Sequence, residues 1–425
     1  MVRAALKAVD AGLLVQNAFS RLDISRAMRS ATAVDVLAVG KSAAAMLNAC
    51  VEASDMPLRH VIGISPYAPD GLPAGAEWHT AAHPIPDERS VIAARAALAT
   101  AAAGAADNLL LVLLSGGASS AMTLPAASVT LGDKRQTSAR LLEEGAEIHE
   151  LNAVRKHISG IKGGQLAAAT PAAVVTLAVS DVIGDDLSSI GSGPTVADPT
   201  TFAEALAVLE RHGGRGGYPA AVQARLVRGA AGDFPETPKP GDVRLSLSTA
   251  HVIGRARDAI EGAREAAELH GFVVHILGDA VTGEARLAGH DLIAAAAAIV
   301  RAHDTNRPLC VLASGETTVT GAREGRGGRN QECVLGMARE IDKLGTAVVA
   351  ASIGTDGVDG PTDAAGGLVD STTLARAEAA DIGPPERYLD EHNSYVFLDE
   401  LDDLVRTGPT RTNVGDLQVI LVGSW

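Results

Sequence analysis

Short apolar runs that end in small or polar residues recur along the chain and predict β-strands. The residues between their ends are mostly Val, Leu, Ile and Ala, and almost every run finishes in Gly, Ser or Asp. Runs of this length, bounded by turn-forming residues, are typical of buried strands. The seven clearest are VDVLAVG (34–40), HVIGIS (60–65), LLLVLLSGG (109–117), AVVTLAVSD (173–181), FVVHILGD (272–279), LCVLASGE (309–316) and AVVAASIGTDG (347–357).

Ala-rich amphipathic stretches lie between these runs and predict helices. Their apolar residues recur at helical spacing, and Gly or a polar residue follows them: VIAARAALATAAAG (91–104), RARDAIEGAREAAELHG (255–271) and ARLAGHDLIAAAAAIVRAH (285–303). Strands that alternate with helices predict an α/β fold with a mainly parallel sheet. In such sheets ligands bind beyond the carboxyl ends of the strands. The Gly, Ser and Asp residues at those ends are therefore the first candidates for a functional site.

One segment interrupts the alternation and predicts a domain boundary. GDFPETPKPGD (232–242) holds three prolines and three acidic residues, and the strand and helix pattern restarts after it. We therefore expect two domains, residues 1–235 and residues 243–425.

Composition and charge narrow the functional classes. The chain has 36 Lys and Arg against 51 Asp and Glu, a formal net charge of −15, and its basic residues are scattered among acidic ones. A nucleic-acid surface needs clustered positive charge, so binding to DNA or RNA is not expected. Aromatic residues are 3% of the chain whereas glycine occurs 45 times, so the placement of glycine is the more informative signal.

The cysteines and the apolar segments indicate the compartment. The three cysteines (Cys50, Cys310 and Cys333) are far apart and show no C-x-x-C spacing, so neither a disulfide framework nor a cysteine zinc site is indicated. The N-terminal residues lack the apolar core of a secretion signal, and no run of about 18 uncharged apolar residues follows. We expect a cytoplasmic protein without a membrane partner.

Two glycine-containing strand ends are candidate anion sites. VGKSAAAM (39–46) resembles a phosphate loop, but Asp35 stands where the first glycine of that motif belongs. Lys41 remains at the start of a predicted helix, where its charge opposes the helix dipole unless an anion lies beside it. Ser115, Gly116 and Gly117, with Ser119 and Ser120, can offer backbone N–H groups to a phosphate or carboxylate. A surface lysine and a plain tight turn are the alternatives.

Charged residues follow in two further segments. ELNAVRKHISGIKGGQLA (150–167) gathers Arg155, Lys156, His157 and Lys162, which suits an anionic small ligand; a solvated helix face is the alternative. AVSDVIGDDLSSIGSGPTVADPT (178–200) places Asp181, Asp185 and Asp186 after a strand. Mg²⁺ prefers such oxygen ligands together with substrate phosphates, whereas helix capping would explain one of the three acids.

Charged residues also gather in the second half of the chain. SGETTVTGAREGRGGRNQE (314–332) places Glu316 at a strand end, and arginines among glycines can clamp phosphoryl oxygens. IGTDGVDGPTDAAGG (353–367) carries three aspartates that could act as base, metal ligand or turn former. TGPTRTNVGDL (407–417) adds polar residues before a final strand. The candidates in these segments are Arg323, Arg326, Arg329, Asn330, Gln331, Asp356, Asp359, Asp363, Thr410, Thr412 and Asn413.

Taken together, these segments resemble the glycerate kinases that carry a C-terminal MOFRL domain, the glycerate 2-kinase family. The resemblance covers nearly the whole chain, and seven motifs occur in the order of that family. They are HPIPDERS (83–90), SGGASS (115–120), NAVRKHISGIKGGQLA (152–167), SDVIGDDLSSIGSGPTVADPTTF (180–202), ETTVTGAREGRGGRNQE (316–332), GTDGVDGPTDAAGG (354–367) and TGPTRTNVGDLQVIL (407–421). Two positions depart from the pattern: Ala118 replaces a glycine of the usual SGGGS, and Ser314 stands where glycine often precedes Gly-Glu.

The resemblance implies a two-domain α/β protein and a reaction. It implies a larger Rossmann-like N-terminal domain, a smaller α/β MOFRL domain with its core at about residues 307–425, and a site in the cleft between them. The implied reaction is the transfer of phosphate from ATP to D-glycerate, giving 2-phosphoglycerate and ADP with Mg²⁺. The partners would be these small molecules, with a homodimer left open.

The resemblance and the residues together assign expected roles. A lysine and an arginine are regarded as catalytic in this family, and they correspond to Lys41 and Arg329 in this sequence. We expect Asp356 to orient the C2 hydroxyl, and Asp181 and Asp186 to hold Mg²⁺. Nucleotide or substrate binding is expected of Ser115, Gly116, Gly117, Ser119, Ser120, Arg155, Lys162, Glu316, Arg326 and Asn330.

Two other functions stay open from the sequence. A hydroxypyruvate reductase would need a G-x-G-x-x-G motif after a strand, but GSGPTV (191–196) ends in Val and GRGGRN (325–330) ends in Asn. A non-catalytic protein that binds a nucleotide or a sugar acid could use the same scaffold. The presence of Lys41, Arg329 and the acidic loops favours the kinase over both alternatives.

Overall fold

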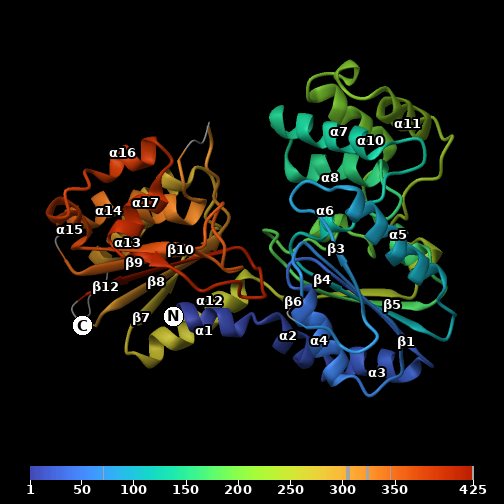
Figure 1. The fold of residues 1–425 in the computed structure, drawn as a ribbon, viewed down its shortest axis with the longest axis horizontal. Helices are drawn as coiled ribbons and strands as arrows, with labels where there is room; N and C mark the ends of the chain where they lie inside the picture. Colours follow the sequence, from blue (N-terminus) through green and yellow to red (C-terminus); the bar gives the residue numbers. More distant parts are fainter. Residues whose placement is uncertain (70, 303–306, 322–324, 345, 424–425) are drawn as a thin grey trace. The chain divides into compact units, whose positions relative to one another are not determined.

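The computed structural model describes residues 1–69, 71–302, 307–321, 325–344 and 346–423 of the chain. It consists of two compact units (Figure 1). The N-terminal unit comprises Ala11–Gly254, and the C-terminal unit comprises Arg255–Trp425 together with Met1–Asp10. The predicted α/β class with two domains is confirmed.

The N-terminal unit is built on a six-stranded sheet in which every pair of neighbouring strands is parallel. In spatial order the strands are β3 (Glu77–Thr80), β2 (Leu58–Ser65), β1 (Val34–Val39), β4 (Leu109–Leu114), β5 (Ala173–Val179) and β6 (Ser248–Gly254). β1 and β4 are buried along their whole length, which explains the continuous apolar sequence of β4; the one charged residue of β1, Asp35, forms an ion pair with Arg59. The order 3-2-1-4-5-6 is that of Rossmann-like sheets, which confirms this part of the prediction.

Helices cover the sheet, and a separate block consists of two helices that follow β4 in the chain and two that follow β5. The covering helices include α2 (Ala11–Phe19), α3 (Leu22–Ser30), α4 (Ala43–Ala53) and α5 (Glu88–Ala102). The block has an apolar core of its own, which includes Leu141, Val154, Phe202 and Leu226. Figure 1 shows its four helices together, at a distance from the sheet: α7 (Leu131–Glu143), α8 (Ile148–His157), α10 (Phe202–Arg211) and α11 (Ala220–Ala230).

Short elements connect this block to the sheet. α6 (Ala118–Ala121) follows β4, α9 (Gln165–Ala168) precedes β5, and the 3-10 turn η1 (Ile190–Ser192) follows β5. Two further 3-10 turns are η2 (Arg215–Gly217) and η3 (Val243–Leu245).

The C-terminal unit contains a mixed sheet. Its spatial order is β11 (Leu404–Val405), β10 (Gly366–Asp370), β9 (Val348–Gly354), β12 (Asp416–Val422), β8 (Leu309–Gly315) and β7 (Val273–Ile276). β7 and β8 are parallel, whereas β12 lies antiparallel between β8 and β9, and β10 is antiparallel to β9. The mainly parallel sheet predicted from the apolar runs therefore describes the N-terminal unit alone.

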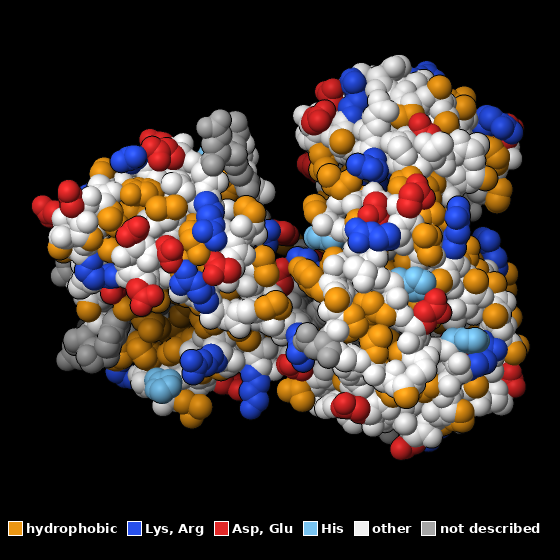
Figure 2. Space-filling view, viewed as in Figure 1, with side chains coloured by type: hydrophobic (Ala, Val, Ile, Leu, Met, Phe, Trp, Pro, Cys, Tyr) orange, Lys and Arg blue, Asp and Glu red, His pale blue; other side chains and the backbone are white. Residues whose placement is uncertain are grey.

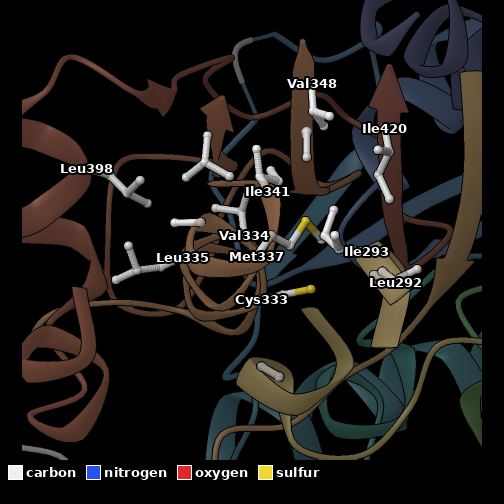
Figure 3. Close-up of a cluster of buried hydrophobic side chains, with 14 of the residues drawn as sticks. Leu292, Ile293, Cys333, Val334, Leu335, Met337, Ile341, Val348, Leu398 and Ile420 are labelled. Carbon is white, nitrogen blue, oxygen red and sulfur yellow. The ribbon is translucent and has the colours of Figure 1, made fainter. Parts of the chain in front are cut away.

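Buried side chains from helices and strands form the core of the C-terminal unit. Leu292 and Ile293 from α13 (Ala285–Ala302) and Met337 from α14 (Arg329–Leu344) lie with the strand residues Val348 and Ile420 (Figure 3). α12 (Ala256–Leu269) packs against α1 (Val2–Ala8). The remaining helices of the unit are α15 (Thr373–Ala379), α16 (Pro385–Asp390) and α17 (Ser394–Glu400).

The division between the units differs from the predicted one. The chain passes from one unit to the other at Gly254–Arg255, whereas the proline-rich segment predicted a break between residues 235 and 243. The difference arises because β6 lies beyond that segment and pairs with β5, from Val174↔Ser248 to Val179↔Gly254. The proline-rich segment is thus a connection within the N-terminal unit.

The distribution of surface charge and the length of the helices relate to the expectations about nucleic acids and membranes. On the face shown in Figure 2, Lys and Arg side chains are interspersed with Asp and Glu on both units. Within the described residues, no helix combines the length and the apolar character needed to span a membrane.

Candidate functional site

Lys41 lies at the point of the N-terminal sheet where the strand order reverses. β1 and β4 are neighbours there, and the segments that follow them contact each other. The N–H of Lys41 donates to the carbonyl oxygen of Gly116 at 2.8 Å, and the N–H of Ser42 donates to Oγ of Ser115 at 3.0 Å. Ligands of doubly wound sheets bind in the crevice at this position. The structure therefore brings together two candidates that the sequence identified separately.

Gly40 allows this close approach. Its φ is +120°, and a Cβ atom at this position would collide with the carbonyl oxygen and Oγ of Ser115. A residue with a side chain would force the two segments apart. Only glycine fits here without displacing the backbone after β4.

His83 is a neighbour of this site that the sequence reasoning missed. A Cβ atom on Gly117, whose φ is +83°, would lie 2.9 Å from Cδ2 of His83 and 3.5 Å from Cγ of Lys41. His83 follows β3, so it too comes from the carboxyl end of the sheet. HPIPDERS (83–90) was a signal for the family, but nothing in its spacing relates it to Gly117.

Lys162 braces the segment after β4 from within the protein. Its side chain is buried, with 1% of its surface exposed. Nζ donates to the carbonyl oxygen of Ser119 at 2.7 Å, to Oγ of Ser119 at 3.1 Å and to the carbonyl oxygen of Gly191 at 3.2 Å. Burial lowers the pKa of Lys162 well below its ordinary value, and the charge of Arg155 adds to this. Ser120 Oγ donates to the carbonyl oxygen of Gly117 at 3.1 Å, which also stabilises the turn.

The three consecutive cations of α8 have different surroundings. Lys156 is buried and forms an ion pair with Asp198 at 3.2 Å, and His157 contacts Glu236 at 3.1 Å. Arg155 is partly exposed, and its Nε donates to Oγ of Ser138 at 3.3 Å. Lys156 and His157 are thus held by carboxylates within the protein, and Arg155 remains the residue of this group that can reach a ligand.

The acidic residues of the turn after β5 also differ in their surroundings. Asp186 accepts hydrogen bonds from the N–H and Oγ of Ser188, at 2.9 and 2.7 Å, and from Oγ of Ser189 at 2.8 Å. Burial acts to raise the pKa of Asp186, but these serine hydrogen bonds outweigh it and the pKa is lowered. These are the contacts of a turn-forming residue, whose carboxylate accepts the N–H two residues further along the chain. Asp181, partly buried, lies two residues after the end of β5.

Arg329 is the centre of a polar cluster in the C-terminal unit. It is the first residue of α14, and its Nε and Nη2 donate to the two carboxylate oxygens of Asp416 at 2.7 and 2.9 Å. Its Nη1 lies 3.1 Å from Oε1 of Glu316. Burial acts to lower the pKa of Arg329, but Asp416 outweighs it and the pKa is raised, so the guanidinium stays charged. Of its five N–H donors, these contacts leave two for a ligand.

Strand register explains why Glu316, Asp416 and Asp356 lie at one edge of the sheet. Asp416 is the first residue of β12 and pairs with Gly315 at the end of β8 and with Gly354 at the end of β9. Glu316 and Asp356 follow those two strands. The sequence identified Glu316 and Asp356, but it missed Asp416, whose side chain is fully buried. The signal in the sequence that could have identified Asp416 was a carboxylate at the start of a buried apolar strand.

Asp359 and Asn330 connect the start of α14 to the same edge. Asp359 is 2% exposed and accepts the N–H groups of Asn330 and Gln331 at 3.1 and 2.8 Å. Nδ2 of Asn330 donates to Asp416 at 3.0 Å, and its Oδ1 accepts from Ser352 at 2.6 Å. Burial raises the pKa of Asp359 to about 7, although the two N–H donors oppose the rise. The buried Asn330 is therefore a structural link as well as a candidate ligand.

Arg326 packs on an aromatic ring in the glycine-rich segment before α14. Its guanidinium carbon lies 3.7 Å from the centre of the Tyr395 ring, and its Nη2 lies 3.8 Å from Asp363. About half of the Arg326 side chain remains exposed, which leaves it accessible to a ligand. Arg323 lies outside the described residues.

Two protein families match the chain. The family described as "Domain of unknown function (DUF4147)" matches residues 1–227, and the MOFRL family matches residues 309–416. The first match alone spans more than half of the 425 residues.

Relatives match the chain over most of its length. "Glycerate 2-kinase" from Pyrococcus horikoshii is 37% identical over 92% of this chain and 88% of its own. "Putative hydroxypyruvate reductase" from Agrobacterium vitis is 43% identical over 91% and 87%. The crystal structure of glycerate kinase from Thermotoga maritima superimposes with a TM-score of 0.85 at 34% identity, covering 99% of this chain and 97% of that one. The chain therefore belongs to the MOFRL-domain glycerate kinase family.

Proposed function

We propose that this protein transfers the γ-phosphoryl group of ATP to the 2-hydroxyl of D-glycerate, giving 2-phosphoglycerate and ADP. The observation that carries the proposal is the position of Lys41 at the strand-order reversal, against the Ser115–Gly117 turn. Phosphoryl transfer requires mainly positioning and neutralisation of charge, and a lysine held beside a glycine turn offers both. The names of the relatives from Pyrococcus horikoshii and Thermotoga maritima support the same reaction.

Each unit contributes one principal cation to this proposal. Lys41 in the N-terminal unit would neutralise charge on the transferred phosphoryl group, and the N–H groups of Gly116 and Gly117 would hold phosphate oxygens. Arg329 in the C-terminal unit would bind phosphoryl oxygens through the N–H donors that Asp416 and Glu316 do not use. Asp356 would orient the acceptor hydroxyl from the same edge of the C-terminal sheet as Arg329.

Asp181 and Asp186 are the acids that would hold a Mg²⁺ ion in this proposal. Among the described residues, no group of three or more His, Cys, Asp and Glu side chains could hold a metal ion. Mg²⁺ bound with ATP needs only one or two carboxylates besides the phosphates. Both acids lie in the segment that follows β5, and the oxygens of Asp186 accept three hydrogen bonds from Ser188 and Ser189. When bound, Mg²⁺ would neutralise charge on the ATP phosphates.

A reductase is the second candidate, because two relatives from Agrobacterium vitis carry that name. The strand order 3-2-1-4-5-6 is also that of dinucleotide-binding sheets, in which the turn after β1 carries G-x-G-x-x-G. In this chain that turn reads Gly40-Lys41-Ser42. Ser42 replaces the second glycine of that motif, the one that allows a pyrophosphate to approach the backbone, so the geometry favours the kinase.

The test is incubation of the purified protein with ATP, Mg²⁺ and D-glycerate. ADP release measures turnover, and ³¹P NMR assigns the position of the phosphate. Formation of 2-phosphoglycerate would support the proposal, and 3-phosphoglycerate would overturn its regiochemistry. Consumption of NADH with hydroxypyruvate, without ADP release, would support the reductase instead. Binding of ATP and D-glycerate without turnover of either kind would indicate a non-catalytic binding protein.

Variants test the role of Lys41 in this reaction. Lys41→Ala should lower turnover on the order of 10²-fold or more, the usual effect of removing a charge that stabilises the transition state. Lys7→Ala, which removes an exposed lysine from α1, is the control and should leave turnover unchanged. Near-normal turnover of Lys41→Ala would contradict the role proposed for Lys41.

A further inference from the structure

Asn152 and Arg155 lie on one face of α8, and each carries N–H groups that donate to no protein acceptor within the described residues. These residues are one turn apart, so their side chains lie on the same side of the helix. Oδ1 of Asn152 accepts a hydrogen bond from Oγ of Ser192 at 3.1 Å, which leaves Nδ2 directed elsewhere. In the part of the chain that the structure describes, neither Nδ2 of Asn152 nor the two terminal nitrogens of Arg155 have a protein partner.

These donors can be reached by a ligand. Asn152 is only 3% exposed, but its Nδ2 is not among the fully buried side-chain atoms that lack a partner, and Arg155 is partly exposed. Lys156, on the same helix, is instead buried in an ion pair with Asp198. The amide nitrogen of Asn152 and the terminal nitrogens of Arg155 can only donate, so they suit a ligand that offers acceptors, namely an anion.

The same face is connected to the Ser115–Gly117 turn. Oγ of Ser192 lies 2.9 Å from Oγ of Ser119, and Lys162 donates to both oxygens of Ser119. Ser119 belongs to α6, which directly follows Gly117. Ser192 itself has a φ of +61°, a left-handed conformation that residues other than glycine adopt mainly where surrounding contacts impose it. Asn152 is thus connected through Ser192 and Ser119 to the segment that follows the turn beside Lys41.

The available charge matches a single negative charge. Lys162 and Lys134 lie near Arg155, but both are buried and donate to oxygens of the protein; Lys134 donates to the carbonyl oxygen of Arg155 at 2.8 Å. Burial lowers the pKa of both lysines. Arg155 is partly exposed, so among these three residues it is the one whose charge a ligand can reach. A monoanion suits it better than the polyphosphate of a nucleotide.

We propose that Arg155 and Asn152 form the subsite for the carboxylate of the acceptor acid, with Arg155 binding it through its terminal nitrogens and Asn152 through Nδ2. This inference rests on the proposed function for the identity of the acid, D-glycerate. Lys162 is a positioning residue in this arrangement, because it holds Ser119, which lies against Ser192 and so supports Asn152.

The test compares KM and kcat in Arg155→Gln, Arg155→Lys and the wild type. A hydrogen bond to a charged group contributes about 1.5–3 kcal/mol, so Arg155→Gln should raise the KM for D-glycerate roughly 10- to 100-fold. The KM for ATP and the melting temperature should change little, and Arg155→Lys should recover part of the loss. Arg95→Gln, which removes an exposed arginine from α5 of the same unit, is the matched control.

Calorimetry separates a failure of this inference from a failure of the proposed function. D-Glycerate is titrated into wild-type protein and into Arg155→Gln, with glycerol as the probe that lacks a carboxylate. If the wild type binds D-glycerate but not glycerol, and Arg155→Gln no longer binds D-glycerate, the subsite is supported. This conclusion holds even if the wild type releases no ADP, because that result would refute only the kinase activity. An unchanged KM and affinity for D-glycerate in a folded Arg155→Gln variant would overturn the subsite while wild-type turnover leaves the kinase intact. A rise confined to the KM for ATP would also overturn it, because Arg155 would then bind the nucleotide.

Discussion

Replacing Gly40 by alanine should separate Lys41 from the turn that holds it. The φ of Gly40 is +120°, and a methyl group there would collide with the carbonyl oxygen and Oγ of Ser115 and lie 2.8 Å from the carbonyl oxygen of Gly116. Two of these atoms belong to backbone and cannot rotate away. The segment after β4 must therefore move, and the hydrogen bonds from the N–H groups of Lys41 and Ser42 must lengthen or break.

The structure allows the loss of stability to be worked out. A non-glycine residue at positive φ costs about 1–2 kcal/mol. Each of the two hydrogen bonds contributes about 1 kcal/mol. We therefore expect Gly40→Ala to lower the free energy of unfolding by about 3–4 kcal/mol. A displacement of about 1 Å at a reacting group can lower turnover on the order of 100-fold, so activity should fall as well.

Gly145→Ala is the matched control. Gly145 lies in the same unit with a φ of +76°, but no atom lies within 4 Å of the position its Cβ would take. It should lose only the backbone contribution, about 1–2 kcal/mol, and keep full turnover. Urea unfolding measures the stability of both variants, and ADP release measures turnover. Equal losses of stability in the two variants, with normal turnover in Gly40→Ala, would refute the reasoning.

Three other predictions follow from contacts in the C-terminal unit. Asp416→Asn should lower turnover about 10- to 100-fold because Arg329 loses a charged partner that aligns it. When Arg329→Ala is already present, Asp416→Asn should lower turnover little further. If Asp416→Asn lowers turnover equally with and without Arg329, Asp416 does not act through Arg329. The pKa of Asp359 is raised from 3.8 to about 7, so the folded chain binds the extra proton between these values. The free energy of unfolding of the wild type, relative to that of Asp359→Asn, should then fall by up to about 1.4 kcal/mol per pH unit as pH rises from 4 to 7, and stay level above 7. Thermal unfolding measures this difference, and a difference that does not change with pH would contradict the reasoning. Met337→Ala should lower the free energy of unfolding by about 2–5 kcal/mol because it leaves a cavity in the buried core, whereas Leu269→Ala, at a side chain that is 87% exposed, should change it by less than about 0.5 kcal/mol in urea unfolding.

The sequence by itself determined seven of the strands and the strand ends at which polar residues gather. All seven apolar runs form strands, and β4, which is buried along its whole length, is apolar throughout because both of its faces are covered. The three Ala-rich amphipathic stretches form α5, α12 and α13. Local chemistry also placed Lys41 and the Ser115–Gly117 turn at strand ends. These are properties of short segments, and short segments are what a single sequence encodes most directly.

Tertiary structure alone decided which residues meet. Asp416 is 87 residues from Arg329 in sequence, and only the antiparallel insertion of β12 between β8 and β9 brings them together. Lys156 and Arg155 are adjacent in sequence, yet Lys156 has Asp198 as its partner, 42 residues away, whereas Arg155 has no carboxylate among the described contacts. Strand order and pairing depend on packing between distant segments, and no local pattern specifies them. For that reason the sequence could name the charged residues of this protein, but only the fold could separate those that hold its structure from those left to bind a ligand.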